Sequence, residues 1–244
     1  MRIDMNLCEL NILPSSSDLS SLPQGKILIN TLNAWSFVVA QQDEAFAEAL
    51  KKGDVLIPDG KSIVWACRFL KTKSQPKERI AGWDLFQHEM KALNDDATVM
   101  FLGSSNDTLE LIKQRAKVDF PHLKIVTYSP PFKTDFSDED NAEMIHAINE
   151  TNPDLLWIGM TAPKQEKWTF QHWNELKINC HTGTIGAVFD FYAGTVKRAP
   201  KWMQNCGLEW LHRLLSNPKR MWKRYLVGNL QFLFLVLRHR TITP

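Results

Sequence analysis

The stretch DATVMFLGSSNDTLELIKQRA, residues 96–116, places a short apolar run directly before a polar turn and an amphipathic segment. The apolar run at 97–103 has the length and composition of a buried strand. Leu109, Ile112 and Ala116 then recur at the spacing of one helical face. A strand that leads into a helix in this way is the unit of an α/β fold.

The same alternation continues on both sides of this stretch. Apolar runs at 26–30, 54–58, 124–129 and 154–160 predict strands, and helix-period segments lie between most of them, including one continuous helix over 35–50. This pattern predicts an α/β fold with a mainly parallel sheet and helices on both faces. After about Ala199 the strands stop and the pattern becomes helical. We therefore expect a sheet domain at 1–195 and a basic helical C-terminal appendage at 196–244.

Composition narrows the possible partners. The 244 residues are 44% hydrophobic and 23% charged, with a net charge of +2, which is ordinary for a soluble protein. The charge is uneven, because the segment from Lys197 to Arg240 holds ten Lys and Arg residues and one acid, Glu209. Such asymmetry indicates an anionic partner, which leaves nucleic acid, an anionic membrane or a phosphate-bearing substrate.

Other features of the sequence argue against a zinc site, a signal peptide and a membrane-spanning helix. The four cysteines are scattered, which predicts reduced thiols in a cytoplasmic protein and no zinc site. Residues 1–18 alternate in polarity, unlike a signal peptide, and the apolar run at 232–237 is too short to span a bilayer. We expect a soluble or peripheral protein. No nucleic-acid recognition motif accompanies the basic segment, so nucleic acid is not expected as a partner.

Four polar clusters follow predicted strands, and open parallel sheets bind ligands at the carboxyl ends of their strands. We therefore expect one site there. The clusters contain Thr31 and Asn33; Asp59 and Gly60; Gly103, Ser104 and Ser105; and Thr161, Lys164, Gln165 and Glu166. Each also has a structural interpretation, since Pro-Asp-Gly is a common turn and Gly-Ser-Ser opens a helix as a cap. The third cluster lacks the full GxGxxG spacing of a dinucleotide-binding loop.

The segment SDED at 137–140 resembles an Asp-x-Asp metal site, but it precedes an amphipathic helix. Ser137 at the N-cap with acids in the first turn is the favoured interpretation. No other carboxylate or histidine cluster has ligand spacing, so we expect no metal and no cofactor. Trp65 is expected to pack in the interior, whereas Trp202, Trp210 and Trp222 are placed for a water–lipid interface.

The stretch GAVFDFYAGTVKRAPKWMQNCGLEWLHRLLSNPKR, residues 186–220, resembles the signature of the TagA/WecG/CpsF family of bacterial glycosyltransferases. The segments TLN, PDG, RIAGWDL, FLGSS and APKQE match in the family's order, and the resemblance covers roughly 26–224. Trp35 departs from the family, since many members carry an acidic residue there, which affects details of the sugar pocket.

The resemblance implies a Rossmann-like fold and an inverting, metal-independent transfer. The sugar, typically of the N-acetylmannosamine type, would pass from a UDP donor to an undecaprenyl-diphosphate-linked sugar on the inner face of the plasma membrane. The resemblance implies Asp59 as the catalytic base, assisted by Thr31 and Arg79. The substrate-binding residues would be Asn33, Gly103, Ser104, Gln165, Asp190, Lys197, Arg198, Arg213 and Arg220.

Several alternatives remain at this stage. A nucleic-acid-binding or membrane-binding module without catalysis would also use a basic, Trp-rich tail. A nicotinamide dehydrogenase is disfavoured because GxGxxG is missing. The apolar residues of the appendage have three possible neighbours, namely their own domain, lipid or a second copy in a homo-oligomer.

Overall fold

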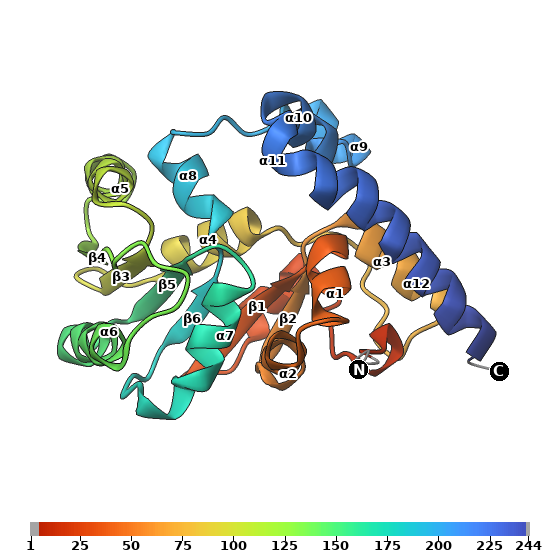
Figure 1. Ribbon diagram of the computed structural model, residues 1–244. Helices are drawn as coiled ribbons and strands as arrows, with labels where there is room; N and C mark the ends of the chain where they lie inside the picture. The colour runs from red at the N-terminus through yellow and green to blue at the C-terminus, as the bar shows by residue number, and fades with distance from the viewer. Residues whose placement is uncertain (1–4, 243–244) are drawn as a thin grey trace.

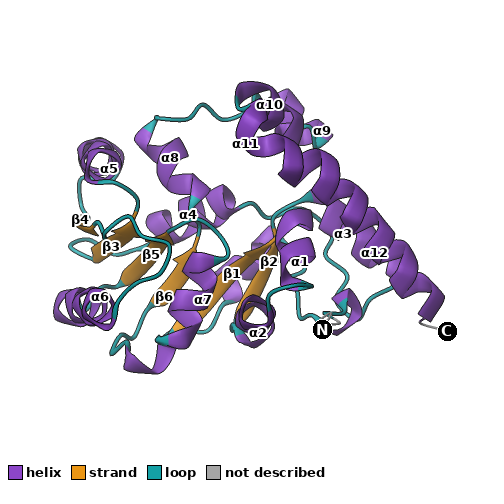
Figure 2. Ribbon diagram, in the orientation of Figure 1, coloured by secondary structure: helices purple, strands orange, loops and turns teal. Residues whose placement is uncertain are grey.

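A computed structural model describes residues 5–242, without the side chains of 205, 220 and 240–242. Six strands form one sheet in the order β2-β1-β6-β5-β3-β4 (Figures 1 and 2). They are β1 (Ile27–Leu32), β2 (Val55–Pro58), β3 (Thr98–Gly103), β4 (Lys124–Tyr128), β5 (Leu155–Gly159) and β6 (His181–Thr184). All five pairings are parallel, which confirms the predicted α/β class.

Helices cover both faces of the sheet. One face packs against α4 (Gly82–Ala92), α5 (Asn106–Asp119) and α8 (Ala187–Ala193), and the other against α1 (Ala34–Ala40), α2 (Glu44–Lys52), α3 (Lys61–Leu70), α6 (Asp138–Thr151) and α7 (Lys164–Gln171). Short 3₁₀ turns lie at Leu7–Glu9, Ser16–Ser21 and Trp173–Glu175. Burial on both faces explains why most strands are uninterrupted apolar runs.

Two elements differ from the sequence-based expectation. The strand β6 reads HTGT and has no apolar run, yet it lies between β1 and β5 in the centre of the sheet. A Cβ at Gly183 would lie 2.3 Å from the Trp157 ring, so the indole fills the space that a side chain would need. The single helix predicted over 35–50 is two helices, because Asp43 caps a new start by accepting a hydrogen bond from the Phe46 N–H.

The interpretation of the SDED segment as a helix cap is confirmed. Ser137 Oγ accepts a hydrogen bond from the Asp140 N–H at 3.2 Å, and the Asp140 carboxylate accepts from the Ser137 N–H at 2.8 Å. The two bonds form a capping box at the start of α6.

The C-terminal segment is helical, as predicted. It comprises α9 (Lys201–Cys206), α10 (Glu209–Ser216), α11 (Pro218–Trp222), a π-helical turn (Lys223–Val227) and α12 (Gly228–Ile242). In Figure 1 the blue helix α12 extends from the group of α10 and α11 toward the C-terminus, and it packs against α1. The Phe232 and Phe37 rings meet edge to face, 5.6 Å between centroids. The apolar side chains of α12 join one core cluster with those of α1. The division into a domain at 1–195 and an appendage at 196–244 stays a prediction.

Candidate active site

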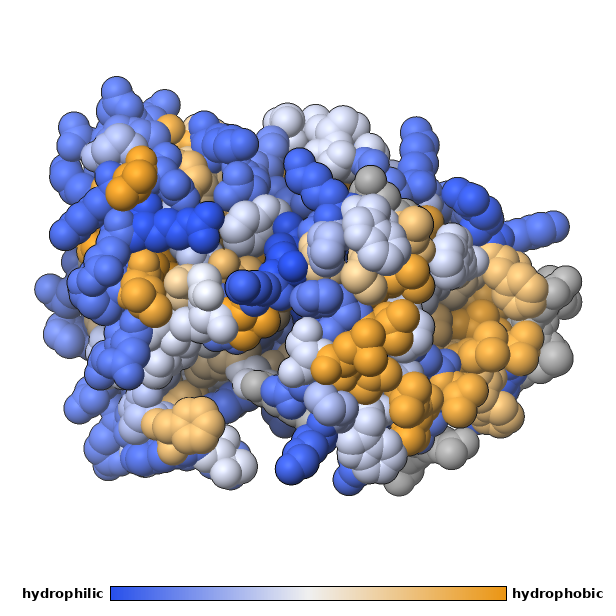
Figure 3. All heavy atoms as spheres, turned by 90° about the horizontal axis from the view of Figure 1, so that it is seen from above, coloured by the Kyte–Doolittle hydropathy of each residue, from blue (hydrophilic) through white to orange (hydrophobic). Residues whose placement is uncertain are grey.

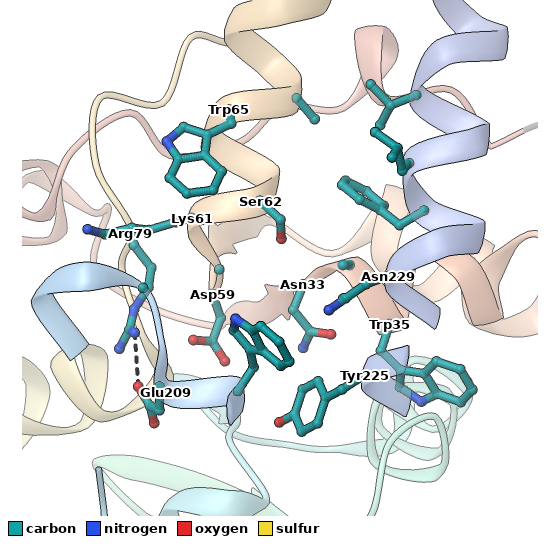
Figure 4. A pocket seen from close by; sticks show the side chains of 18 of the residues that line it. Asn33, Trp35, Asp59, Lys61, Ser62, Trp65, Arg79, Glu209, Tyr225 and Asn229 are labelled. Atoms are coloured by element: carbon teal, nitrogen blue, oxygen red, sulfur yellow. Dashed lines mark hydrogen bonds and ion pairs between the residues drawn. The ribbon is translucent and has the colours of Figure 1, made fainter. Parts of the chain in front are cut away.

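A cavity of about 580 Å³ lies between the carboxyl ends of β1 and β2 and the C-terminal helices (Figure 4). The sheet side contributes residues from the turns after β1 and β2 and from the segment before α4. The C-terminal side contributes residues of α10, the π-helical turn and α12. Its polar lining includes Asn33, Asp59, Lys61, Ser62, Arg79, Glu209, Arg213, Arg224, Tyr225 and Asn229.

Asp59 lies at the point where β2 ends. Pro58 closes the strand, and its carbonyl accepts a hydrogen bond from the Ile80 N–H at 3.1 Å, which holds the Arg79 segment beside this turn. Asn33 follows β1 and caps α1, since its Oδ1 accepts from the Ser36 N–H at 3.1 Å. Asn33 therefore serves the helix as well as the lining.

The pKa of Asp59 is suited to proton transfer near neutral pH. Burial raises the pKa from its ordinary value of 3.8 to about 6, against the opposing effect of the Arg79 and Arg213 charges. A carboxylate with such a pKa is ionised at pH 7 and still accepts a proton readily, as a general base must.

Three arginines surround one carboxylate at the polar end of the cavity. Arg79 Nη1 donates to Glu209 Oε2 at 2.9 Å, and Arg213 Nη2 donates to Glu209 Oε1 at 3.4 Å. Arg198 Nε lies 3.9 Å from Glu209 Oε1, and its guanidinium covers the Trp83 ring. We call these three arginines the arginine cluster. It carries more positive charge than Glu209 neutralises, which suits it to an anion such as a diphosphate.

The opposite wall of the cavity is apolar. Trp65 and Phe69 of α3 face Phe232, Leu233 and Val236 of α12 across it. The expectation that Trp65 packs in the interior is wrong, because Trp65 is 60% exposed at the cavity. It lies off the stripe of Ile63, Ala66 and Cys67 that α3 buries.

The outer side of the C-terminal helices carries a group of exposed apolar side chains. We call this group the outer apolar face; it comprises Trp222, Leu226, Val227, Leu230 and Phe234, and the exposed Leu233 and Leu237 belong to the cavity lining. Figure 3 shows orange side chains gathered on this side of the molecule. Over residues 5–242, none of the helices has the length and hydropathy to cross a bilayer. Within the same residues, His, Cys, Asp and Glu side chains form no group of three that would hold a metal ion.

The structure brings together four of the predicted site residues on the cavity lining: Asn33, Asp59, Arg79 and Arg213. Arg198 joins them through Glu209. Thr31 lies within β1, Asp190 within α8, and Lys197 is exposed before α9, all three off this lining. Arg220 belongs to α11, and its side chain lies outside the described part of the structure.

Gly103 and Ser104 also lie off the lining, and their geometry explains the residue types. Gly103 has a φ of +123°, and a Cβ there would lie 2.4 Å from the Gly159 carbonyl oxygen, so only glycine fits. The Ser104 N–H donates to the same carbonyl at 3.0 Å. These residues join the ends of β3 and β5.

Gln165 also lies off the lining and is buried, 4% exposed. Its Nε2 donates to Glu166 Oε1 at 2.8 Å, and its Oε1 accepts from the Gly186 N–H at 3.2 Å. Gln165 thus ties α7 to the turn before α8. Burial raises the pKa of Glu166 to about 7.

The sequence-based list missed Glu209, Arg224 and Tyr225, which all line the cavity. Glu209 had a visible signal, because it is the single acid among the ten cations of the C-terminal segment. Arg224 and Tyr225 had none, since a basic or aromatic residue in that segment fits lipid and substrate equally well.

The model of the glycosyl transferase WecG/TagA/CpsF family matches residues 15–243. The chain belongs to this family. The resemblance noted in the sequence is therefore confirmed. Because this is a family of glycosyltransferases, the chain is an enzyme, and the alternative of a binding module without catalysis is set aside.

Three relatives of the chain carry the same name, N-acetylglucosaminyldiphosphoundecaprenol N-acetyl-beta-D-mannosaminyltransferase. The protein of Bacillus subtilis strain 168 is 30% identical over 200 residues, 82% of this chain and 75% of its own. That of Bacillus spizizenii is 30% identical over 240 residues, 98% and 90% of the two chains. A Staphylococcus aureus protein is 26% identical over 197 residues, 80% and 74%.

Proposed function

We propose that this enzyme transfers an N-acetylmannosamine-type sugar from a UDP donor to an undecaprenyl-diphosphate-linked sugar, with inversion and without a metal ion. One observation carries the proposal: a single cavity is lined by the half-buried carboxylate of Asp59, by Arg79 and Arg213 of the arginine cluster, and by an apolar wall. A base, a diphosphate-binding group and a lipid-facing surface are what such a transfer requires. The names of the relatives supply the donor sugar and the acceptor.

The chemistry assigned to Asp59 is a single displacement. The acceptor hydroxyl oxygen attacks the anomeric carbon, and its proton moves to the Asp59 carboxylate. The bond from the anomeric carbon to the diphosphate oxygen breaks as the new bond forms, and UDP leaves with the electron pair. A positioned base of this kind contributes ~10²–10⁴-fold to the rate.

The arginine cluster would stabilise the leaving group. The UDP diphosphate gains negative charge as the bond breaks, and the guanidinium groups of Arg79, Arg198 and Arg213 present paired N–H donors in a site shielded from water. Because these cations neutralise the developing charge, the proposed transfer does not require a divalent ion. Arg220 and Arg224 extend the same positive region in the sequence.

The apolar surfaces would serve the lipid. The wall formed by Trp65, Phe69 and α12 lies in the same cavity as Asp59, so it would contact the isoprenoid units next to the acceptor diphosphate. The outer apolar face and the surrounding cations would hold the enzyme peripherally on the anionic inner surface of the plasma membrane. Trp222 sits among these groups as an interfacial residue does.

Six residues stay proposed from the family resemblance alone. Their geometry joins strands and helices around the site or leaves them at the surface, so a direct contact with substrate is not required to explain them. They are Thr31, Gly103, Ser104, Gln165, Asp190 and Lys197.

The test is a panel of UDP-sugars with a short-chain polyprenyl-diphosphate-GlcNAc acceptor, with UDP release as the readout. We expect release with UDP-N-acetylmannosamine that depends on the acceptor and persists in a chelator. Preference for another UDP-sugar would overturn the donor assignment. Equal release with a water-soluble GlcNAc lacking the lipid would overturn the role of the apolar wall, and loss of activity in the chelator would overturn metal independence.

A further inference from the structure

Glu209 holds an unusual position for a surface-helix acid. It opens α10, and its side chain is 14% exposed, as is that of Arg79. Its two carboxylate oxygens accept hydrogen bonds from arginines of different parts of the chain. Arg79 lies 130 residues earlier, before α4, and Arg213 lies one turn later in α10. Figure 4 shows the Arg79–Glu209 pair beside Asp59.

A local role does not account for these contacts. An acid in the first turn of a helix stabilises the helix dipole without any distant partner. The Glu209 carboxylate is instead directed at the sheet domain, where Arg79 meets it at 2.9 Å. Burial alone would raise its pKa, but Arg213, Arg79 and Arg198 hold the pKa of Glu209 below its ordinary value. Glu209 is therefore a charged group at neutral pH.

The electrostatic effect of Glu209 falls on the three arginines. The side chains of Arg79, Arg198 and Arg213 are 14%, 18% and 24% exposed. Water therefore screens their mutual repulsion poorly. A carboxylate among them offsets that repulsion and fixes the direction of each guanidinium. The carboxylates of Asp59 and Asp84 also act on these arginines, and Arg224 adds a fourth cation, so a small excess of positive charge is left to attract a diphosphate.

We propose that Glu209 is a positioning residue that gathers Arg79, Arg198 and Arg213 into one anion-binding cluster and thereby holds the C-terminal helices closed over Asp59. The inference rests on the proposed function only for the identity of the anion, the diphosphate of UDP. A competing view is that Glu209 occupies the place of the diphosphate and is displaced by it. The two views predict opposite changes in UDP affinity when the charge is removed.

The test uses the full chain with Glu209→Gln, which keeps the shape and removes the charge. Glu48→Gln is the matched control, because Glu48 forms an exposed ion pair with Lys52 within α2. Hydrogen exchange of the α10 amides is measured without ligand, with the α5 amides as an internal reference. UDP binding is measured by calorimetry, and donor KM and kcat by UDP release.

Because a charge-assisted hydrogen bond is lost, we expect α10 exchange to rise by about tenfold or more, with α5 unchanged. UDP binding should weaken by about tenfold, and donor KM should rise by a similar factor. The double variant Arg79→Gln with Glu209→Gln should raise α10 exchange by less than the product of the two single effects, since both changes break the Arg79–Glu209 contact. If Glu209→Gln does not fold, Glu209→Asp replaces it, with smaller changes in the same directions.

Tighter UDP binding by Glu209→Gln would overturn the inference in favour of the competing view. Unchanged exchange and unchanged UDP affinity would overturn it as well. Wild-type protein that fails to bind UDP, while Glu209→Gln still accelerates α10 exchange, would support the closure and refute the proposed function instead.

Discussion

Replacing Asp59 with asparagine should make the protein more stable and almost inactive. Asparagine keeps the size of the side chain and resembles its protonated form. The pKa of Asp59 is raised by burial from 3.8 to about 6, so the folded protein disfavours the ionised group. At about 1.4 kcal/mol per pH unit, ionised Asp59 lowers the free energy of unfolding by up to about 3 kcal/mol above pH 6.

The sign follows from the direction of the pKa change. Below pH 3.8 the side chain is protonated in both states, and Asp59→Asn should match the wild type. As the pH rises from 3.8 to about 6, the free energy of unfolding of the wild type should fall relative to that of the variant. Above about pH 6 the difference between the two should be constant. Urea titrations at pH 4, 5, 6 and 8 measure this difference, with Asp95→Asn, in an exposed turn, as the control.

Activity supplies the second half of the prediction. UDP release by Asp59→Asn should fall by ~10²–10⁴-fold, and wild-type kcat/KM should fall as the pH drops below about 6. Near wild-type turnover in the folded variant would refute the base assignment. If the free energies of unfolding of Asp59→Asn and the wild type differ by the same amount at pH 4 and at pH 8, the conclusion that burial raises the pKa of Asp59 is wrong.

Three further changes test the outer apolar face, the packing of α12 and an ion pair of β6. Leu230 on the outer apolar face is 70% exposed, and Leu230→Glu should weaken binding to anionic vesicles without lowering stability, whereas Leu111→Glu on α5 should leave vesicle binding unchanged. Phe232→Ala should lower the urea-measured free energy of unfolding by about 3–5 kcal/mol, and a loss under about 1 kcal/mol would contradict the docking of α12 on α1. The pKa of His181 is raised by its hydrogen bond to Glu89, so this contact should add to the free energy of unfolding below pH 6.5, and the contribution should be lost at higher pH. His181→Gln should flatten the pH dependence of the free energy of unfolding, and an unchanged pH profile would contradict this role of the His181–Glu89 contact.

The strand pattern was readable from the sequence because parallel strands are buried on both faces. Five of the six strands are apolar runs, and their alternation with helices defines the α/β class. The sixth strand, β6, could not be predicted from the sequence, because its Gly183 makes room for the Trp157 ring and its threonines are polar. The break at 41–43 depends on the cap by Asp43, which periodicity does not show.

Chain order alone placed Asp59 and Asn33 at one edge, since the carboxyl ends of neighbouring parallel strands must meet there. It also placed Gly103 and Ser104 there, where the same residue types serve a turn against Gly159. A tight turn and a phosphate-binding loop have similar sequences, so only the backbone geometry distinguishes the two.

The closing half of the cavity was decided by tertiary structure. The apolar residues of α12 are spread around the helix rather than gathered on one face, so the sequence does not indicate which face is buried or what covers it. Packing of Phe232 against Phe37 answers that question and carries α10 over the sheet. Arg79 Nη1 and Glu209 Oε2 thereby lie 2.9 Å apart, although 130 residues separate them in the chain. No local sequence pattern predicts this contact, because it depends on how the side chains pack.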